Sequence, residues 1–178
     1  MKSHRVLITG SAGSGKTTLA RFFKQKGKAS IDMDTSGLGI WLDKDGKKAK
    51  GPPYINSETN EWSHKNGLRW NWDAGKLNSL IKKNTDIYIF GSAWNMNDFL
   101  NLFDKKYYLD ASQDLINERL DKRNKEGKEY NDWGRTDEQR AKIFSIFKTK
   151  AASARKNGFI FVDASLSMEK IFEIICSR

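Results

Sequence analysis

The stretch Gly10-Ser11-Ala12-Gly13-Ser14-Gly15-Lys16-Thr17 decides the fold of this chain. It matches the spacing G-x-x-x-x-G-K-[ST], and it joins a short apolar run, residues 5–9, to a segment of helical periodicity, residues 16–26. Glycines let such a loop turn its main-chain N–H groups onto phosphate oxygens, and the helix that follows adds positive potential at the same place. The stretch therefore predicts a phosphate-binding loop; the alternative is an ordinary glycine-rich turn.

Two side chains of this loop have specific roles in the predicted chemistry. The Lys16 ammonium is a compact charge for the β- and γ-phosphates of ATP, and the Thr17 hydroxyl is a suitable ligand for Mg²⁺. ATP and Mg²⁺ are therefore the expected cofactors. Residues 10–17 and Thr18 are the expected nucleotide contacts.

Apolar runs of strand length alternate with helical periodicity along most of the chain. The predicted strands are residues 5–9, 29–34, 86–90, 106–109 and 159–162, and the predicted helix caps are Asp73, Asn97, Ser112, Thr136 and Ser167. Alternation of this kind predicts an α/β fold, in which a five-stranded parallel sheet carries helices on both faces. We expect one domain, residues 1–178.

Two segments interrupt the alternation. Residues 36–72 hold five glycines, both prolines and four of the six tryptophans. Because a long structureless stretch inside a domain is unusual unless it is functional, we interpret residues 36–72 as an insertion that covers a substrate site. Its tryptophans either stack on a base or sugar or, as is more frequent, pack a small core. The polar residues 124–135 are expected to form a short lid.

The composition indicates the kinds of partner. The formal net charge is +10, which favours nucleotides, phosphorylated metabolites or nucleic acid. The lysines are scattered, so a solvated surface is favoured over a nucleic-acid track. The single cysteine, Cys176, fits a reducing compartment, and no apolar run reaches the length of a secretion signal or a membrane span. We expect a cytoplasmic protein without a membrane partner, either a monomer or a homodimer.

The phosphate loop and the Asp32-x-Asp34 strand after it resemble the superfamily of nucleoside-monophosphate kinases and shikimate/gluconate kinases. Later segments agree with this resemblance: residues 107–111 before a helix with two arginines, residues 133–136, and residues 162–164. The resemblance implies a three-layer P-loop NTPase fold, with Arg135 on the far side of the lid and Asp163 in the segment that contacts adenine.

The chain also departs from that pattern. No acidic residue ends the strand at residues 86–90, so the resemblance implies that Asp32 helps to hold the metal. The turn that begins with Gly91 and Ser92 resembles the small-residue turn of shikimate and gluconate kinases, but Trp94 follows where gluconate kinases have basic residues. The arginine that adenylate kinases usually carry just after this strand is also missing.

Two pairs of side chains are the strongest candidates for chemistry. Asp32 and Asp34 would face the same side of an extended strand, so that Asp32 orients Mg²⁺ through water and Asp34 accepts the proton of an attacking hydroxyl; the alternative is a pair that caps a turn. Arg119 and Arg123 share a helix face and could neutralise charge during transfer. Their alternative is pairing with nearby acids such as Glu118 and Glu126.

The predicted acceptor site consists of Asp34, Arg69, Gly91 and Ser92, with Arg69 as a ligand for an acceptor anion. The leading hypothesis is an ATP-dependent kinase that acts on a small acceptor, such as a nucleoside, a nucleotide or a shikimate- or gluconate-like hydroxyl compound. Two hypotheses stay open beside it: a polynucleotide 5′-hydroxyl kinase, and a nucleotide-binding regulatory module without transfer activity.

Overall fold

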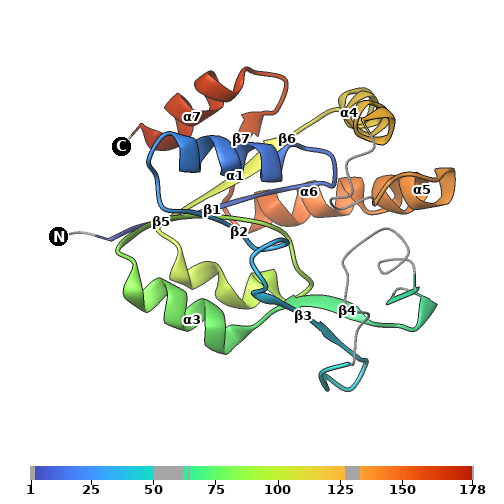
Figure 1. Cartoon of the computed structure of the whole chain (residues 1–178), viewed down its shortest axis with the longest axis horizontal. Helices are drawn as coiled ribbons and strands as arrows, with labels where there is room; N and C mark the ends of the chain where they lie inside the picture. Colours follow the sequence, from blue (N-terminus) through green and yellow to red (C-terminus); the bar gives the residue numbers. More distant parts are fainter. Residues whose placement is uncertain (1–2, 50–61, 64, 127–132, 178) are drawn as a thin grey trace.

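A five-stranded parallel sheet forms the centre of the molecule, as Figure 1 shows. The computed structural model describes residues 3–49, 62, 63, 65–126 and 133–177. The strand order is β2-β5-β1-β6-β7, and the strands are β1 (His4–Gly10), β2 (Ser30–Asp32), β5 (Asp86–Phe90), β6 (Lys105–Asp110) and β7 (Ile160–Asp163). The prediction of a five-stranded parallel sheet is confirmed.

The central strand β1 explains why the sheet is buried on both faces. Its apolar run Val6-Leu7-Ile8 is completely buried. Val6 and Ile8 belong to one core cluster and Leu7 to the other, because successive side chains of a strand point to opposite faces. A continuous apolar run is thus the sequence pattern of a strand covered on both sides.

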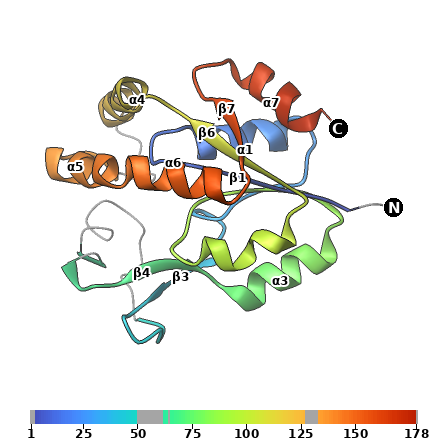
Figure 2. The same cartoon turned by 180° about the vertical axis from the view of Figure 1, so that it is seen from behind.

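Helices cover both faces of the sheet (Figure 2). The first cluster packs under α1 (Lys16–Gln25), α4 (Gln113–Lys125), α5 (Asp137–Ser145) and α7 (Met168–Cys176). The second packs under α3 (Ala74–Lys83), the 3₁₀ helix η1 (Met96–Leu102) and α6 (Phe147–Lys156). The three-layer arrangement expected from the sequence is therefore present.

Four of the five predicted helix caps are confirmed. The side chains of Asp73, Ser112, Thr136 and Ser167 each accept a hydrogen bond from a main-chain N–H in the first turn of their helix. The prediction for Asn97 is wrong, because the short helix starts at Met96 and its cap position is Asn95, two residues earlier. Asn95 does not cap it either, since its side chain is bonded to the main chain of Trp72.

The helix predicted after Thr136 is two helices, because α5 ends at Ser145 and α6 begins at Phe147. The capping-box pattern is realised only in part. Thr136 Oγ1 accepts from Gln139 N at 3.2 Å, whereas Gln139 Oε1 accepts from Gly134 N at 2.9 Å and from Arg135 N at 3.0 Å. The buried glutamine thus fixes the chain just before the helix.

Residues 36–72 contain regular structure that the sequence patterns missed. Strands β3 (Gly39–Leu42) and β4 (Arg69–Trp72) pair in an antiparallel two-stranded sheet. Figures 1 and 2 show this ribbon on the α3 side of the central sheet. Much of the connection between β3 and β4 lies outside the described residues.

The segment expected to form a lid is only partly described. Helix α4 continues through Lys125, so the first two residues of the range 124–135 are helical. Residues 127–132 lie outside the described part of the chain. Within the described residues, no helix combines the length and the apolar character that crossing a membrane requires.

Candidate active site

The phosphate loop runs from β1 into α1, at the carboxyl edge of the sheet. Gly13 and Gly15 have φ angles of 80° and 100°, in the left-handed region that side chains with a Cβ avoid. A Cβ at Gly10 would lie 2.6 Å from Ser14 Oγ and 2.9 Å from the carbonyl oxygen of Leu109. The three glycines are therefore required by backbone angle or by close packing.

The Lys16 side chain folds back over the loop. Its Nζ donates to the carbonyl oxygens of Gly10, at 3.0 Å, and Ser11, at 2.9 Å. Burial lowers the pKa of this ammonium below its ordinary value, whereas Asp34 and Asp32 act in the opposite direction. Lys16 is therefore held ready at the phosphate position, between the loop and two carboxylates.

A tyrosine that the sequence analysis did not single out supports the loop from the neighbouring strand. The hydroxyl of Tyr108, on β6, is 3.3 Å from Ser11 Oγ. Both residues are buried, at 2% and 3% exposure, so this hydrogen bond is shielded from water. Because the carbonyl of Ser11 also binds Lys16, Tyr108 helps to place the lysine of the phosphate loop.

The two aspartates meet at the end of β2, although the geometry differs from the expectation. The strand ends at Asp32, and Asp34 lies in the turn that follows. Asp32 Oδ1 accepts from Asp34 N at 3.0 Å, so Asp32 caps the turn while it remains beside Lys16. The turn-capping interpretation of this pair is therefore observed, and its functional role stays a prediction.

Asp34 is the most perturbed carboxylate of the site. Burial raises its pKa to about 6, Lys16 opposes the increase, and Asp32 adds to it. The indole Nε1–H of Trp70 donates to Asp34 Oδ1 at 3.2 Å and favours the ionised form. A carboxylate with this pKa is suited to accept a proton near neutral pH.

The ribbon of β3 and β4 holds Trp70 in place. The ring lies so close to Gly39 that a Cβ there would come within 1.9 Å of it. Trp41 packs edge-on against Trp70, with ring centroids 5.2 Å apart. Trp41 and Trp72 are buried, at 7% and 1% exposure, so the small-core interpretation of these tryptophans is the correct one for both.

Lys150, on α6, is a site residue that the sequence patterns did not reveal. Burial lowers its pKa to about 8, Lys16 adds to the reduction, and Asp34 opposes it. The structure thus brings a second partly buried lysine close to the first one, next to a carboxylate. Lys150 precedes Ala151, which packs in the core, and nothing in the local sequence distinguishes it from the many exposed lysines.

The two predicted arginines lie on α4 but contact different parts of the molecule. Arg119 donates to the carbonyl oxygens of Ser14, at 2.8 Å, and Ala164, at 2.7 Å, so it connects the phosphate loop to the loop after β7. Arg123 donates to the carbonyl oxygen of Trp133. It is also close enough to Lys16 to lower the pKa of that lysine. Both arginines therefore border the phosphate site.

The remaining predicted residues differ in their exposure. Arg69 is exposed and packs on Trp94, and Arg135 is exposed beside α5. Gly91 is buried against Met33 and Trp72, where a Cβ would come within 2.9 Å of the Met33 side chain. Ser92 follows Gly91 at the end of β5, and Thr17 and Thr18 form the first turn of α1.

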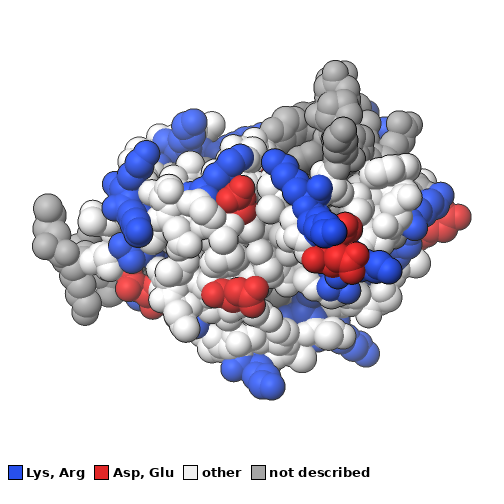
Figure 3. All heavy atoms as spheres, turned by 90° about the horizontal axis from the view of Figure 1, so that it is seen from below, with Lys and Arg blue, Asp and Glu red and all other residues white. Residues whose placement is uncertain are grey.

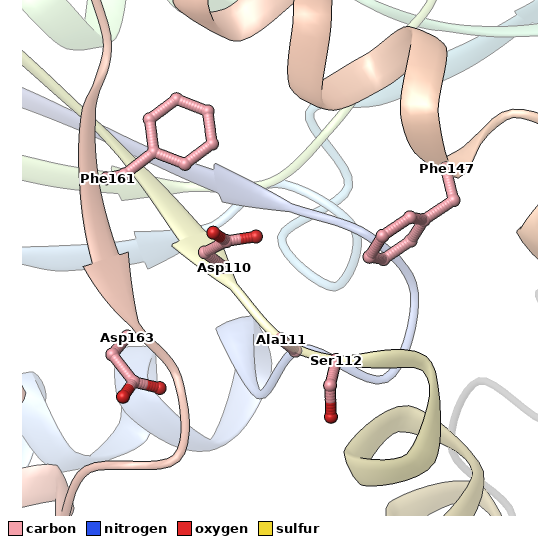
Figure 4. Close-up of a pocket in the computed structure, with 6 residues that line it drawn as sticks. All are labelled: Asp110, Ala111, Ser112, Phe147, Phe161 and Asp163. Atoms are coloured by element: carbon pink, nitrogen blue, oxygen red, sulfur yellow. The ribbon is translucent and has the colours of Figure 1, made fainter.

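Asp163 and an open cavity mark the ends of β6 and β7. The cavity has a volume of about 530 Å³. It is lined by Asp110, Ala111, Ser112, Phe147, Phe161 and Asp163 (Figure 4). Hydrogen bonds from the side chain and from the main-chain N–H of Ser165, the latter to Asp163 Oδ1, lower the pKa of the Asp163 carboxyl group. Two carboxylates and two aromatic rings line this cavity, and a contact of Asp163 with adenine stays a prediction.

The residues present fit magnesium and a nucleotide. Asp32 Oδ2 and Ser14 Oγ are buried without a hydrogen-bond partner among the described residues, so each has capacity left for a ligand. The same part of the chain contains no group of three or more histidines, cysteines or acids that could hold a metal alone. The free carboxylate oxygen of Asp32 is a ligand of the kind that Mg²⁺ takes, since this ion binds oxygen donors and keeps several waters.

Solved structures of three kinds of kinase resemble this molecule. Shikimate kinase from Acinetobacter baumannii in complex with shikimate matches with a TM-score of 0.58 and 15% identity, over 99% of this chain and 94% of that one. Deoxyadenosine kinase from M. mycoides with bound dATP matches with a TM-score of 0.57 and 17% identity, over 96% of both chains. The fold is that of the P-loop small-molecule kinases.

A gluconokinase from Sinorhizobium meliloti 1021 also has this fold. It matches with a TM-score of 0.55 and 14% identity, over 97% of this chain and 89% of that one. No protein-family model and no curated protein matches the chain. Because all these identities are low, the comparisons establish the fold, and the chemistry has to be argued from the site itself.

Proposed function

We propose that this protein is an ATP-dependent kinase that transfers the γ-phosphoryl group to a hydroxyl of a small acceptor. The observation that carries the proposal is the position of Asp34. A carboxylate whose pKa is raised to about 6 lies beside the lysine of the phosphate loop. A loop that only bound nucleotide would need no such group, whereas transfer to a hydroxyl needs a proton acceptor there.

The phosphates of ATP would bind to the loop amides and to Lys16. The Lys16 ammonium then exchanges its two carbonyl partners for phosphate oxygens. Thr17 and Asp32 would hold Mg²⁺, which, when bound, neutralises charge on the β- and γ-phosphates. Arg119 closes the other side of the loop through its bond to the Ser14 carbonyl.

Transfer would proceed at the gap between Lys16 and Asp34. Asp34 takes the proton of the acceptor hydroxyl as the hydroxyl oxygen forms a bond to the γ-phosphorus. The bond from that phosphorus to the β–γ bridging oxygen breaks, and ADP leaves with the electron pair. Lys150 is suited to neutralise the transferred group, because it is close to both Lys16 and Asp34.

One face of the molecule supports a small acceptor rather than a polynucleotide. Among the described residues on the face drawn in Figure 3, lysines and arginines form separate groups with acidic residues between them and no continuous basic band. Nucleic-acid binding relies on a continuous row of cations along the phosphates. The net charge of +10 is therefore explained on this face by a dispersed, solvated set of side chains.

Two substitutions test the proposal. Lys16→Ala should lower ATP affinity and abolish transfer, and Asp34→Asn should keep ATP binding but lower the transfer rate by about 100-fold or more. Transfer is measured with labelled ATP and a panel of nucleosides, nucleotides and hydroxy acids. Lys24→Ala is the matched control, since Lys24 is exposed on the same helix as Lys16.

The outcomes separate a kinase from a regulatory module. If ATP binds with magnesium but no acceptor of the panel is phosphorylated, the protein is a nucleotide-binding module and the assignment of Asp34 is wrong. If Asp34→Asn transfers as fast as the parent protein, another group removes the proton.

A further inference from the structure

One tryptophan near the candidate site is left open to solvent. Trp94 is 69% exposed, the largest value among the exposed large hydrophobic residues of the described chain. The guanidinium carbon of Arg69 lies 4.3 Å from the centroid of its ring. One face of the indole is thus covered by a cation, and we call the two side chains the Arg69–Trp94 platform.

The turn that carries the platform is fastened to β4. Trp94 N donates to the carbonyl oxygen of Trp70 at 2.8 Å. The side chain of Asn95 accepts from Trp72 N at 2.9 Å and donates to the Trp72 carbonyl at 3.0 Å. Three hydrogen bonds therefore hold the main chain at Trp94 against β4, and the Arg69 guanidinium packs on the indole itself.

Trp70 connects the platform to the reaction centre. Its carbonyl binds Trp94 and its indole binds Asp34, so one residue bridges the proton acceptor and the exposed ring. A nucleoside has a comparable build, since its sugar separates the reactive hydroxyl from a planar base. A polyol or a small hydroxy acid has no planar ring to place on an indole.

We propose that the acceptor of this kinase is a nucleoside or nucleotide, whose base stacks on the open face of Trp94 while its hydroxyl lies at Asp34. This inference rests on the proposed kinase function and names its acceptor class. Stacking of a base on an aromatic side chain strengthens binding by about tenfold. Any base can stack, but an acceptor without a planar ring cannot, so stacking favours nucleosides over polyols. The Arg69 guanidinium keeps one face of the indole covered and offers its remaining N–H groups to a phosphate.

The test measures acceptor binding with the donor site already filled. Mg²⁺ and ADP are first shown to bind by calorimetry, and the protein is then kept saturated with both so that added adenosine cannot enter the donor site. Adenosine and D-ribose are titrated separately into the full chain and into three variants. The variants are Trp94→Ala, Trp94→Phe and, as the matched control, Trp62→Phe, since Trp62 is another exposed tryptophan, at 47% exposure.

We expect adenosine to bind and ribose to bind far more weakly. Trp94→Ala should weaken adenosine binding by about tenfold, while Trp94→Phe and Trp62→Phe should stay within about twofold of the parent protein. Equal adenosine affinity in Trp94→Ala, or equal affinity of the parent for ribose, would overturn the inference. Salt-sensitive labelling of an oligonucleotide that far exceeds labelling of adenosine would also overturn it, in favour of a nucleic-acid end.

Failure of this inference can be told apart from failure of the kinase proposal. If Mg²⁺ and ADP do not bind at all, the phosphate-loop chemistry itself is wrong. If they bind, and an acceptor without an aromatic base, such as shikimate or gluconate, is phosphorylated while adenosine is not, the kinase proposal stands and only the role of the platform is refuted.

Discussion

The hydrogen bond from Trp70 to Asp34 controls the pH range in which the proposed base can work. Trp70→Phe removes the N–H donor and keeps an aromatic ring against Gly39 and Trp41. The carboxylate then loses a partner that favours its ionised form. The pKa of Asp34 should therefore rise, because burial and Asp32 still raise it while only Lys16 and Lys150 continue to lower it.

The size of this change follows from the energy of the bond. A hydrogen bond to a charged group contributes about 1.5–3 kcal/mol, and one pKa unit corresponds to about 1.4 kcal/mol. At the lower end, the pKa of Asp34 rises from about 6 to about 7. The ionised fraction at pH 6 then falls from about one half to about one tenth, while at pH 8 it falls only from about 99% to about nine tenths.

The assay is the pH profile of kcat/KM for the acceptor between pH 5 and pH 8.5. Activity of the parent protein should fall on the acid side with an apparent pKa near 6, and Trp70→Phe should move this limb upward by about one unit with little change at pH 8. Trp41→Phe is the control, since Trp41 touches the Trp70 ring. If a folded Trp70→Phe variant keeps the parent profile, Trp70 does not tune the base. If the parent has no acid limb, Asp34 is not the base.

Three further predictions concern the surroundings of the site. Lys150→Met should make the ligand-free protein more stable by about 1–2 kcal/mol at pH 7 in urea denaturation, because the pKa lowered from 10.5 to about 8 shows that the charged form is disfavoured in the fold. As the pH rises from 8 toward 10.5, the parent protein should regain stability relative to Lys150→Met. The Lys150→Met variant should also transfer the phosphoryl group more slowly, whereas Lys148→Met should change neither stability nor transfer. Equal stability of the parent and Lys150→Met at pH 7 would contradict the argument. Tyr108→Phe should raise the KM for ATP about fivefold and leave kcat unchanged, since the phosphate loop loses one buried neutral hydrogen bond; an unchanged KM would show that this bond does not position the loop. Gly39→Ala should cost about 1–3 kcal/mol of stability and move the acid limb as Trp70→Phe does, because its Cβ would collide with the Trp70 ring; a normal profile would show that the ring can shift freely.

The parts of the fold that the sequence predicts well are those with short-range patterns. The apolar run of β1 and the caps at Asp73, Ser112, Thr136 and Ser167 depend on neighbours a few residues away, so they are legible in one sequence. The β3–β4 pair was not legible. Its two strands are four residues each, they are separated by a long connection, and their pairing depends on contacts such as Trp70 on Gly39.

The candidate site divides in the same way. The phosphate loop and the two aspartates can be read from spacing, because they are adjacent in sequence. Lys150 and Tyr108 enter the site through the packing of α6 and β6, and their own sequence neighbours give no hint of it. Arg69 was proposed as an anion ligand, and its contact with Trp94 became visible only when β4 and the turn after β5 were placed side by side.

Trp70 links the β3–β4 ribbon to Asp34, so the ribbon cannot be exchanged between proteins of this fold without affecting Asp34. The β3–β4 ribbon is a separate two-stranded sheet. It nevertheless supplies the N–H donor that lowers the pKa of Asp34, a carboxylate that follows a strand of the central sheet. Exchanging the ribbon alone would retune the proton chemistry together with the choice of substrate. A transplant that preserved the rate would have to bring its own indole, or evolve another donor for Asp34.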